Sequence, residues 1–196
     1  MKPHPLATRL LRLAGWELEG TVPPVAKCVA LGVPHTSNWD GVLMLAMAAS
    51  AGIDMSFMIK DDWLRGPMGP IMQRLGAIGI DRSKANNVVD TMVEAFRTHD
   101  RLWLVIPPEG TRSLSTHWKS GFYHIARGAD VPVVPGYMDY KRKRLGMGAP
   151  IHLTGDVRAD MDRIRTFYAE HHPVPHKPAD FGPIRLKDEG PPAPAA

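Results

Sequence analysis

His35 and Asp40 are the first pair of side chains in this chain that could move a proton together. A carboxylate that holds an imidazole in one tautomer lets the histidine act as general base on a hydroxyl. The chain has nine histidines, so chance alone gives on the order of half a match to a five-residue His-to-Asp spacing. Inside one regular helix the two side chains would point about 140° apart. Spacing alone therefore indicates no site, and the neighbouring residues must decide.

Those neighbours favour a geometry in which the two side chains meet. Pro34 ends an apolar segment, Ser37 can cap a helix, and Asp40 stands three residues later at the capping-box position. Side chains in a first helical turn lean back toward the N-terminus, so Asp40 can reach a His35 that lies just outside the helix. The alternative is that Asp40 only caps the helix and that His35 is a loop residue.

A second group of chemically capable residues, PPEGTRS at positions 107–113, directly follows the apolar segment 102–106. Ligands of α/β sheets bind at the carboxyl ends of strands. Gly110 allows close backbone approach, Thr111 offers a hydroxyl, and Arg112 offers a fork for a phosphate. An ordinary polar loop with a solvated arginine is the alternative.

Arg82 repeats this placement at the end of the segment 76–82, just past a short apolar run. If both runs are strands of one parallel sheet, Arg82 and Arg112 can converge on one anion. Taken alone, Arg82 would be expected to be an ordinary surface residue.

The elements that must position these residues alternate along the chain. Apolar, β-branched runs predict strands, and periodic segments predict helices. The expected strands are 26–33, 56–59, 77–80, 102–106 and 131–135, and the expected helices are 39–51, 68–75, 86–98, 119–127 and 158–170. This alternation predicts a single α/β domain with a largely parallel sheet flanked by helices.

The ends of the chain differ from its middle. Residues 1–20 include an amphipathic segment, 5–15, which is either a surface helix packed on the domain or an interfacial anchor for anionic lipid. Residues 173–196 form a Pro-rich tail whose last part we expect to be disordered. With 196 residues and 44% hydrophobic content, the part between them can bury one core.

The apolar stretches and the cysteine content of the chain indicate which cellular compartment it fits. The longest nearly apolar stretch, residues 41–53, is 13 residues long, whereas a membrane-spanning helix takes about 20. We expect no secretory signal, because the N-terminal residues lack a sustained apolar core before a cleavage site. The lone Cys28 lies in an apolar run, so a disulfide framework is excluded and a reducing compartment fits.

The net charge of +4 favours anionic partners: nucleic acid, an acidic membrane surface or phosphorylated substrates. The basic run KRKR at 141–144 is expected to be a solvated turn rather than a lipid-binding patch. We expect no nucleic acid, because the chain has no aromatic-interleaved basic stripe or RNA-binding signature. No metal site is expected either, because the His-Glu-x-x-His and paired-Cys spacings are missing.

Taken together, the ordered motifs resemble a known family. The His35/Asp40 pair and the segments 76–82, 108–113 and 131–135 look like the four blocks of the glycerolipid acyltransferase superfamily. Its best-known members are 1-acylglycerol-3-phosphate acyltransferases. The segments 60–64 and 118–121 are similar to connecting segments of that family, and the resemblance extends over residues 27–136.

The resemblance implies a glycerol-phosphate-acyltransferase-like domain over residues 21–172. Such an enzyme moves a fatty acyl group from acyl-CoA or acyl-carrier protein to the free hydroxyl of a lysophospholipid such as 1-acylglycerol-3-phosphate, without a cofactor. His35 would be the general base and Asp40 its orienting partner, and residues 131–135 would form a core strand that shapes the acyl pocket. The implied substrate-binding residues are Arg82, Glu109, Gly110, Thr111, Arg112 and Lys119.

The chain departs from the family at two points. Pro107 stands where the family has an aromatic or aliphatic residue, so the entry into the loop can differ in shape. We find no long hydrophobic pair of N-terminal helices, which leaves open both the route to lipid and whether lysophosphatidate is the acceptor. We expect a cytoplasmic protein, peripheral on the inner face of the cell membrane, whose partners are a lysolipid, a thioester donor and the anionic membrane surface. The alternatives are an acyltransferase for another lysolipid, such as lyso-ornithine lipid, and a non-catalytic lipid-binding module.

Overall fold

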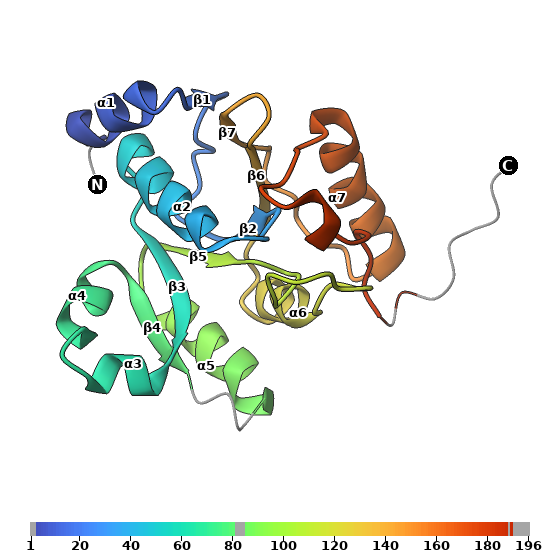
Figure 1. Cartoon of the computed structure of the whole chain (residues 1–196). Helices are drawn as coiled ribbons and strands as arrows, with labels where there is room; N and C mark the ends of the chain where they lie inside the picture. Colours follow the sequence, from blue (N-terminus) through green and yellow to red (C-terminus); the bar gives the residue numbers. More distant parts are fainter. Residues whose placement is uncertain (1–2, 81–84, 188, 190–196) are drawn as a thin grey trace, which may run out of the picture.

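The strands of the computed structural model form one mixed sheet (Figure 1). The structure describes residues 3–80, 85–187 and 189, with only the backbone of 85–87. The described strands are β1 (Glu17–Glu19), β2 (Lys27–Val33), β3 (Met55–Lys60), β4 (Ala77–Ile80), β5 (Leu102–Ile106), β6 (Val133–Asp139) and β7 (Arg144–Met147). Their order across the sheet is β1-β7-β6-β2-β5-β3-β4. Only β6 and β7 pair antiparallel within this described sheet, so the predicted largely parallel α/β fold is confirmed.

Helices cover both faces of the sheet (Figure 1). They are α1 (Pro5–Leu13), α2 (Asn38–Ala51), α3 (Asp61–Arg65), α4 (Gly69–Arg74), α5 (Ala85–Thr98), α6 (Gly121–Gly128) and α7 (Val157–His171), followed by a 3₁₀ turn, η1 (Pro178–Asp180). The core under α5, α6 and α7 receives Val29 and Leu31 of β2, whereas the core under α2 receives Cys28 and Ala30. Because alternate side chains of a strand point to opposite faces, the central strand has to be apolar throughout.

The parallel register brings the ends of three strands to one edge. Leu31 of β2 is opposite Ile106 of β5 on one side and Pro135 of β6 on the other. The chain therefore leaves β2, β5 and β6 at the same edge, where ligands of such sheets bind. β6 is longer than expected from its sequence, and the short elements β1, β7 and α3 were not predicted.

The first and last described segments, α1 and residues 173–187, pack on the domain. Leu11 of α1 is buried against α2, while Leu6, Leu10 and Leu13 remain exposed. The segment 173–187 also packs on the domain, since Leu186 is buried and pairs with Trp118. The packed chain therefore continues beyond residue 172, within the predicted Pro-rich tail 173–196, whose last residues lie outside the described part. No helix in the described ranges has the length and apolar character to cross a bilayer.

Candidate active site

The loop between β2 and α2 is built as a capping box. Ser37 Oγ accepts the Trp39 backbone N–H at 3.2 Å. Asp40 Oδ2 accepts the backbone N–H groups of Thr36 and Ser37, each at 2.7 Å. The start of α2 is therefore where the sequence predicts it, and the Asp40 carboxylate turns back toward the loop.

His35 lies just outside α2 and faces Asp40. Its Nδ1 is 3.4 Å from Asp40 Oδ2, and the two side chains are 24% and 1% exposed respectively. Burial alone would raise the pKa of the Asp40 carboxyl, but hydrogen bonds from His35, Tyr140, Ser37 and Thr36 outweigh it and hold the pKa below its ordinary value. Asp40 therefore stays ionised beside a ring that is partly exposed.

Glu109 joins the loop after β5 to the His35 loop. Its Oε1 accepts the His35 backbone N–H at 3.0 Å, while Oε2 is buried and has no hydrogen-bond partner among the described residues. Burial raises the pKa of this carboxyl from 4.5 to about 7, against the opposing effect of its hydrogen bonds. The side chain that the family resemblance assigns to acceptor binding thus contacts the backbone that carries His35.

The rest of this loop is exposed next to α2. The Arg112 guanidinium donates a hydrogen bond to the Asn38 side chain at the first position of α2. Gly110 has a φ of +66°, and a Cβ there would come within 2.9 Å of Lys119 Cγ, so the turn requires glycine. Thr111 is exposed, and its Oγ1 accepts the Ser113 backbone N–H.

The structure therefore brings six of the eight expected site residues to the loops that follow β2 and β5: His35, Asp40, Glu109, Gly110, Thr111 and Arg112. A seventh expected residue, Lys119, also contacts the loop after β5, because its backbone N–H donates to Pro108 O at 2.7 Å. Arg82 lies outside the described residues. The strand before it, β4, is parallel to β3 and ends at the same edge.

One contact could not be predicted from the sequence. The hydroxyl of Tyr140, which follows β6, donates to Asp40 Oδ1 at 2.6 Å. The two residues are 100 positions apart, and Tyr140 belongs to no recognisable motif. The pairing of β6 beside β2 would have been the only signal, because it brings both strand ends to one edge.

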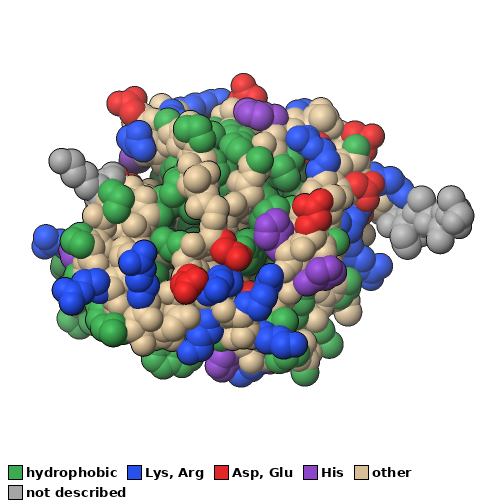
Figure 2. All heavy atoms as spheres, turned by 90° about the horizontal axis from the view of Figure 1, so that it is seen from above, with side chains coloured by type: hydrophobic (Ala, Val, Ile, Leu, Met, Phe, Trp, Pro, Cys, Tyr) green, Lys and Arg blue, Asp and Glu red, His purple; other side chains and the backbone are tan. Residues whose placement is uncertain are grey.

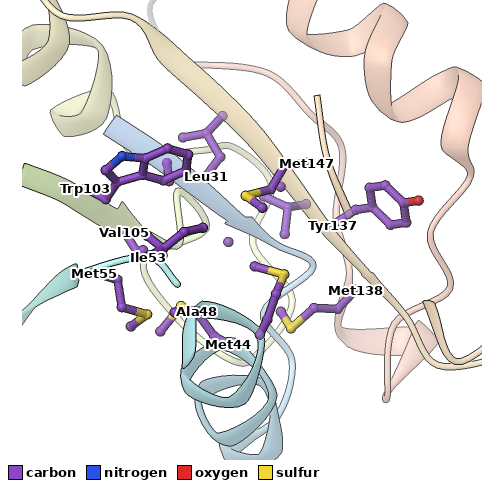
Figure 3. Close-up of a pocket in the computed structure, with 15 residues that line it drawn as sticks. Leu31, Met44, Ala48, Ile53, Met55, Trp103, Val105, Tyr137, Met138 and Met147 are labelled. Carbon is purple, nitrogen blue, oxygen red and sulfur yellow. The ribbon is translucent and has the colours of Figure 1, made fainter. Parts of the chain in front are cut away.

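A narrow apolar cavity of about 30 Å³ lies between α2 and the sheet (Figure 3). Its walls include Gly32 and Val33, close before His35 in the chain, and five methionines: Met44, Met47, Met55, Met138 and Met147. The strand expected to shape an acyl pocket contributes through β6 residues 136–138, just beyond the predicted segment. Methionine side chains are flexible and adapt to irregular apolar shapes, so this wall can yield to a guest.

Cys28 is another nucleophile to consider. Cys28 is fully buried, and burial raises the pKa of its thiol well above the ordinary value, so it is not a reactive thiolate. Across the residues that the structure describes, no three His, Cys, Asp or Glu side chains cluster as metal ligands.

Comparisons with known proteins bear on the family and the fold of the chain. A family model described as Acyltransferase matches residues 21–139. Among solved structures, the 1-acyl-sn-glycerophosphate (LPA) acyltransferase PlsC from Thermotoga maritima has a similar fold, with a TM-score of 0.58 and 14% sequence identity over 84% of this chain and 76% of that chain. No curated protein matches significantly. The family match includes the His35 and Glu109 loops, whereas Tyr140 lies one residue beyond it.

Proposed function

The chain belongs to the Acyltransferase family, and from this premise we propose that it moves a fatty acyl group from a thioester donor to the free hydroxyl of a lysophospholipid such as 1-acylglycerol-3-phosphate. The donor is acyl-CoA or acyl-carrier protein. The observation that carries the proposal is the contact between His35 and the buried Asp40 at the edge of the sheet, beside the loop of Glu109 and Arg112.

His35 acts as the general base. With Nδ1 directed at Asp40, the lone pair on Nε2 can take the proton of the acceptor hydroxyl. The acceptor oxygen attacks the thioester carbonyl and forms a C–O bond, which gives a tetrahedral oxyanion. Its collapse breaks the C–S bond, and the thiolate leaves with the proton that His35 had taken. No acyl-enzyme forms, which fits the burial of Cys28 and the capping role of Ser37.

The basic residues of the site hold the phosphate of the acceptor. Arg112 is exposed at the beginning of α2, where helix N–H groups also favour an anion. β4, which precedes Arg82 in the sequence, ends at the same edge of the sheet, and Lys119 lies against Gly110. Thr111 completes the rim with its hydroxyl, and Gly110 allows the tight turn that presents it.

The methionine-walled cavity between α2 and the sheet accepts the acyl chain. Its 30 Å³ has room for about one water, so the chain enters by displacing methionine side chains. Because Gly32 and Val33 line the cavity just before His35 in the chain, we expect an acyl chain inside it to have its carbonyl toward His35.

α1 provides the contact with the membrane. Leu6, Leu10 and Leu13 are exposed on this helix together with the basic Arg9 and Arg12. Such a helix lies in the interface of an anionic bilayer. This supports a cytoplasmic protein that is peripheral on the inner face of the cell membrane.

The basic turn at 141–144 contributes little to that surface. Arg142 pairs with Asp139, Arg144 pairs with Glu17, and the Lys143 ammonium donates to Ala14 O. These three basic side chains therefore have partners within the protein. Figure 2 likewise shows Lys and Arg side chains spread over one face with Asp and Glu among them, rather than gathered in one patch.

The substrate is tested by incubating the purified protein with acyl-CoA or acyl-carrier protein and a panel of lysolipids, with mass spectrometry of the products. The proposal expects acylated lysophosphatidate and release of free CoA or carrier only when an acceptor is present. If only lyso-ornithine lipid were acylated, the protein would be an acyltransferase for another lysolipid, which is the alternative to the proposed acceptor. Binding of lipid without any acyl product would overturn the enzymatic proposal.

A further inference from the structure

Tyr140 completes the set of hydrogen bonds around the Asp40 carboxylate. Its hydroxyl donates to Asp40 Oδ1 at 2.6 Å. The other oxygen, Oδ2, accepts the backbone N–H groups of Thr36 and Ser37 and faces His35 Nδ1. Among the described contacts, Tyr140 is thus the sole donor to Oδ1.

We infer that Tyr140 is a positioning residue of the reaction, because its hydroxyl fixes the rotation of the Asp40 carboxylate and, through it, the His35 ring. This inference rests on the proposed function, in which His35 is the base. Both carboxylate oxygens lie off the Cβ–Cγ axis, so the Tyr140 hydrogen bond at Oδ1 adds to the two backbone hydrogen bonds at Oδ2 in resisting rotation about that bond. Removing the tyrosine hydroxyl would also leave a buried, charged oxygen without a partner.

The Tyr140 ring is itself in contact with two other rings. The Trp16 ring meets it edge-on, with centroids 5.1 Å apart, and the centroid of the His176 ring lies 4.9 Å away. The Tyr140 backbone N–H donates to Val174 O at 2.9 Å. The segment after α1 and the segment after α7 therefore both support the residue that binds Asp40.

The segment after α7 also reaches the catalytic loop directly. The Lys177 backbone N–H donates to Thr36 Oγ1 at 3.1 Å. Thr36 is 1% exposed, and its own backbone N–H binds Asp40. The loop and Tyr140 are thus anchored to one stretch of chain, residues 174–177, which lies outside the region that the family model matches.

The ionisation of the pair is consistent with this role. Burial, followed by the hydrogen bond to Asp40 and the charge of Asp40, raises the pKa of the Tyr140 hydroxyl far above its ordinary value. Tyr140 therefore keeps its proton and remains a donor at every pH at which the enzyme works.

A matched pair elsewhere in the chain separates positioning from simple stabilisation. The Tyr123 hydroxyl donates to Asp160 Oδ2 at 2.8 Å, and Asp160 also accepts the backbone N–H groups of Thr154 and Gly155. This pair joins α6 to α7 and has no contact with the His35 loop among the described hydrogen bonds. Like the Tyr140–Asp40 contact, it is a hydrogen bond from a tyrosine hydroxyl to an aspartate carboxylate, but it lies outside the candidate active site.

The experiment measures kcat and KM for acyl transfer with Tyr140→Phe, Asp40→Asn, the double variant and Tyr123→Phe, together with thermal melting. A lost hydrogen bond to a charged group predicts a kcat for Tyr140→Phe that is roughly 10- to 100-fold lower, with KM unchanged. In the Asp40→Asn background the same change should have almost no further effect, because Tyr140 acts through Asp40. Tyr123→Phe should lower the melting temperature and leave kcat as it is.

Three results would overturn the inference. The first is an unchanged kcat for Tyr140→Phe. The second is a double variant in which Tyr140→Phe lowers kcat by the same factor on the Asp40→Asn background as it does in the wild type. The third is a loss of kcat in Tyr123→Phe equal to that in Tyr140→Phe. A wild-type chain that transfers no acyl group to any lysolipid would overturn the proposed function and this inference with it. An active wild-type chain with an unaffected Tyr140→Phe variant would refute the positioning role alone.

Discussion

Glu109 accepts the backbone N–H of His35 at 3.0 Å, and this hydrogen bond joins two motifs that are 74 residues apart in the chain. The carboxylate contacts the His35 loop, and its second oxygen is buried without a described partner. A buried carboxyl in this position favours its protonated form.

Glu109→Gln should make the stability of the protein less dependent on pH. Burial raises the pKa of Glu109 from 4.5 to about 7, so the folded protein binds this proton more tightly than the unfolded chain. The stabilisation is complete below pH 4.5 and is lost as the pH rises through 7, on the order of 3 kcal/mol in all. Glutamine keeps the acceptor for the His35 N–H and does not titrate.

Urea denaturation at pH 5 and pH 8 provides the measurement. Between these values the free energy of unfolding of the wild type should fall relative to that of Glu109→Gln. The matched variant Glu94→Gln, at an exposed position of α5, should follow the wild type. A constant difference between Glu109→Gln and wild type across this range would show that Glu109 does not titrate there.

Arg112→Ala should weaken the binding of phosphorylated acceptors specifically. A hydrogen-bonded charge contact contributes about 1.5–3 kcal/mol, so KM for lysophosphatidate should rise roughly 10- to 100-fold. KM for a monoacylglycerol, which has no phosphate, should stay the same. Steady-state kinetics with both acceptors distinguish these effects, and Arg97→Ala on α5 serves as the control for loss of an exposed arginine. An equal rise of KM for both acceptors would contradict phosphate recognition.

The double variant Leu6→Ser/Leu10→Ser should lower affinity for anionic vesicles. Both side chains are more than half exposed on α1, so the folded domain loses little by the change. Burying one leucine at an interface contributes on the order of 1 kcal/mol, so removing two predicts a roughly 10-fold or greater loss in vesicle sedimentation. Leu18→Ser, on β1, is the control and should bind as the wild type does. Unchanged binding of the double variant would leave α1 as a helix that only packs on the domain.

Local sequence signals predicted the fold well, because the strands that form its centre are apolar on both faces and bounded by turn residues. β2 and β5 follow this pattern, and so does the capping box that begins α2. The short β1 and β7 were missed since they carry charged or small residues, such as Glu17 and Gly146, and owe their pairing to the neighbouring strand.

The candidate site could be predicted only where its chemistry lies within one loop. His35 and Asp40 face each other through a local turn, and Arg112 follows its strand directly. The contact of Tyr140 with Asp40 and the use of Glu109 as a backbone acceptor depend on which strands lie side by side. A single sequence does not contain that pairing.

The central claim, that His35 is the general base of an acyl transfer, is tested most directly by the rate of acyl transfer from acyl-CoA to lysophosphatidate in His35→Ala. The account predicts a kcat that is roughly 10²- to 10⁴-fold lower than that of the wild type, with a folded protein and no acyl-enzyme detected by mass spectrometry. A His35→Ala variant that keeps most of the wild-type rate would contradict it.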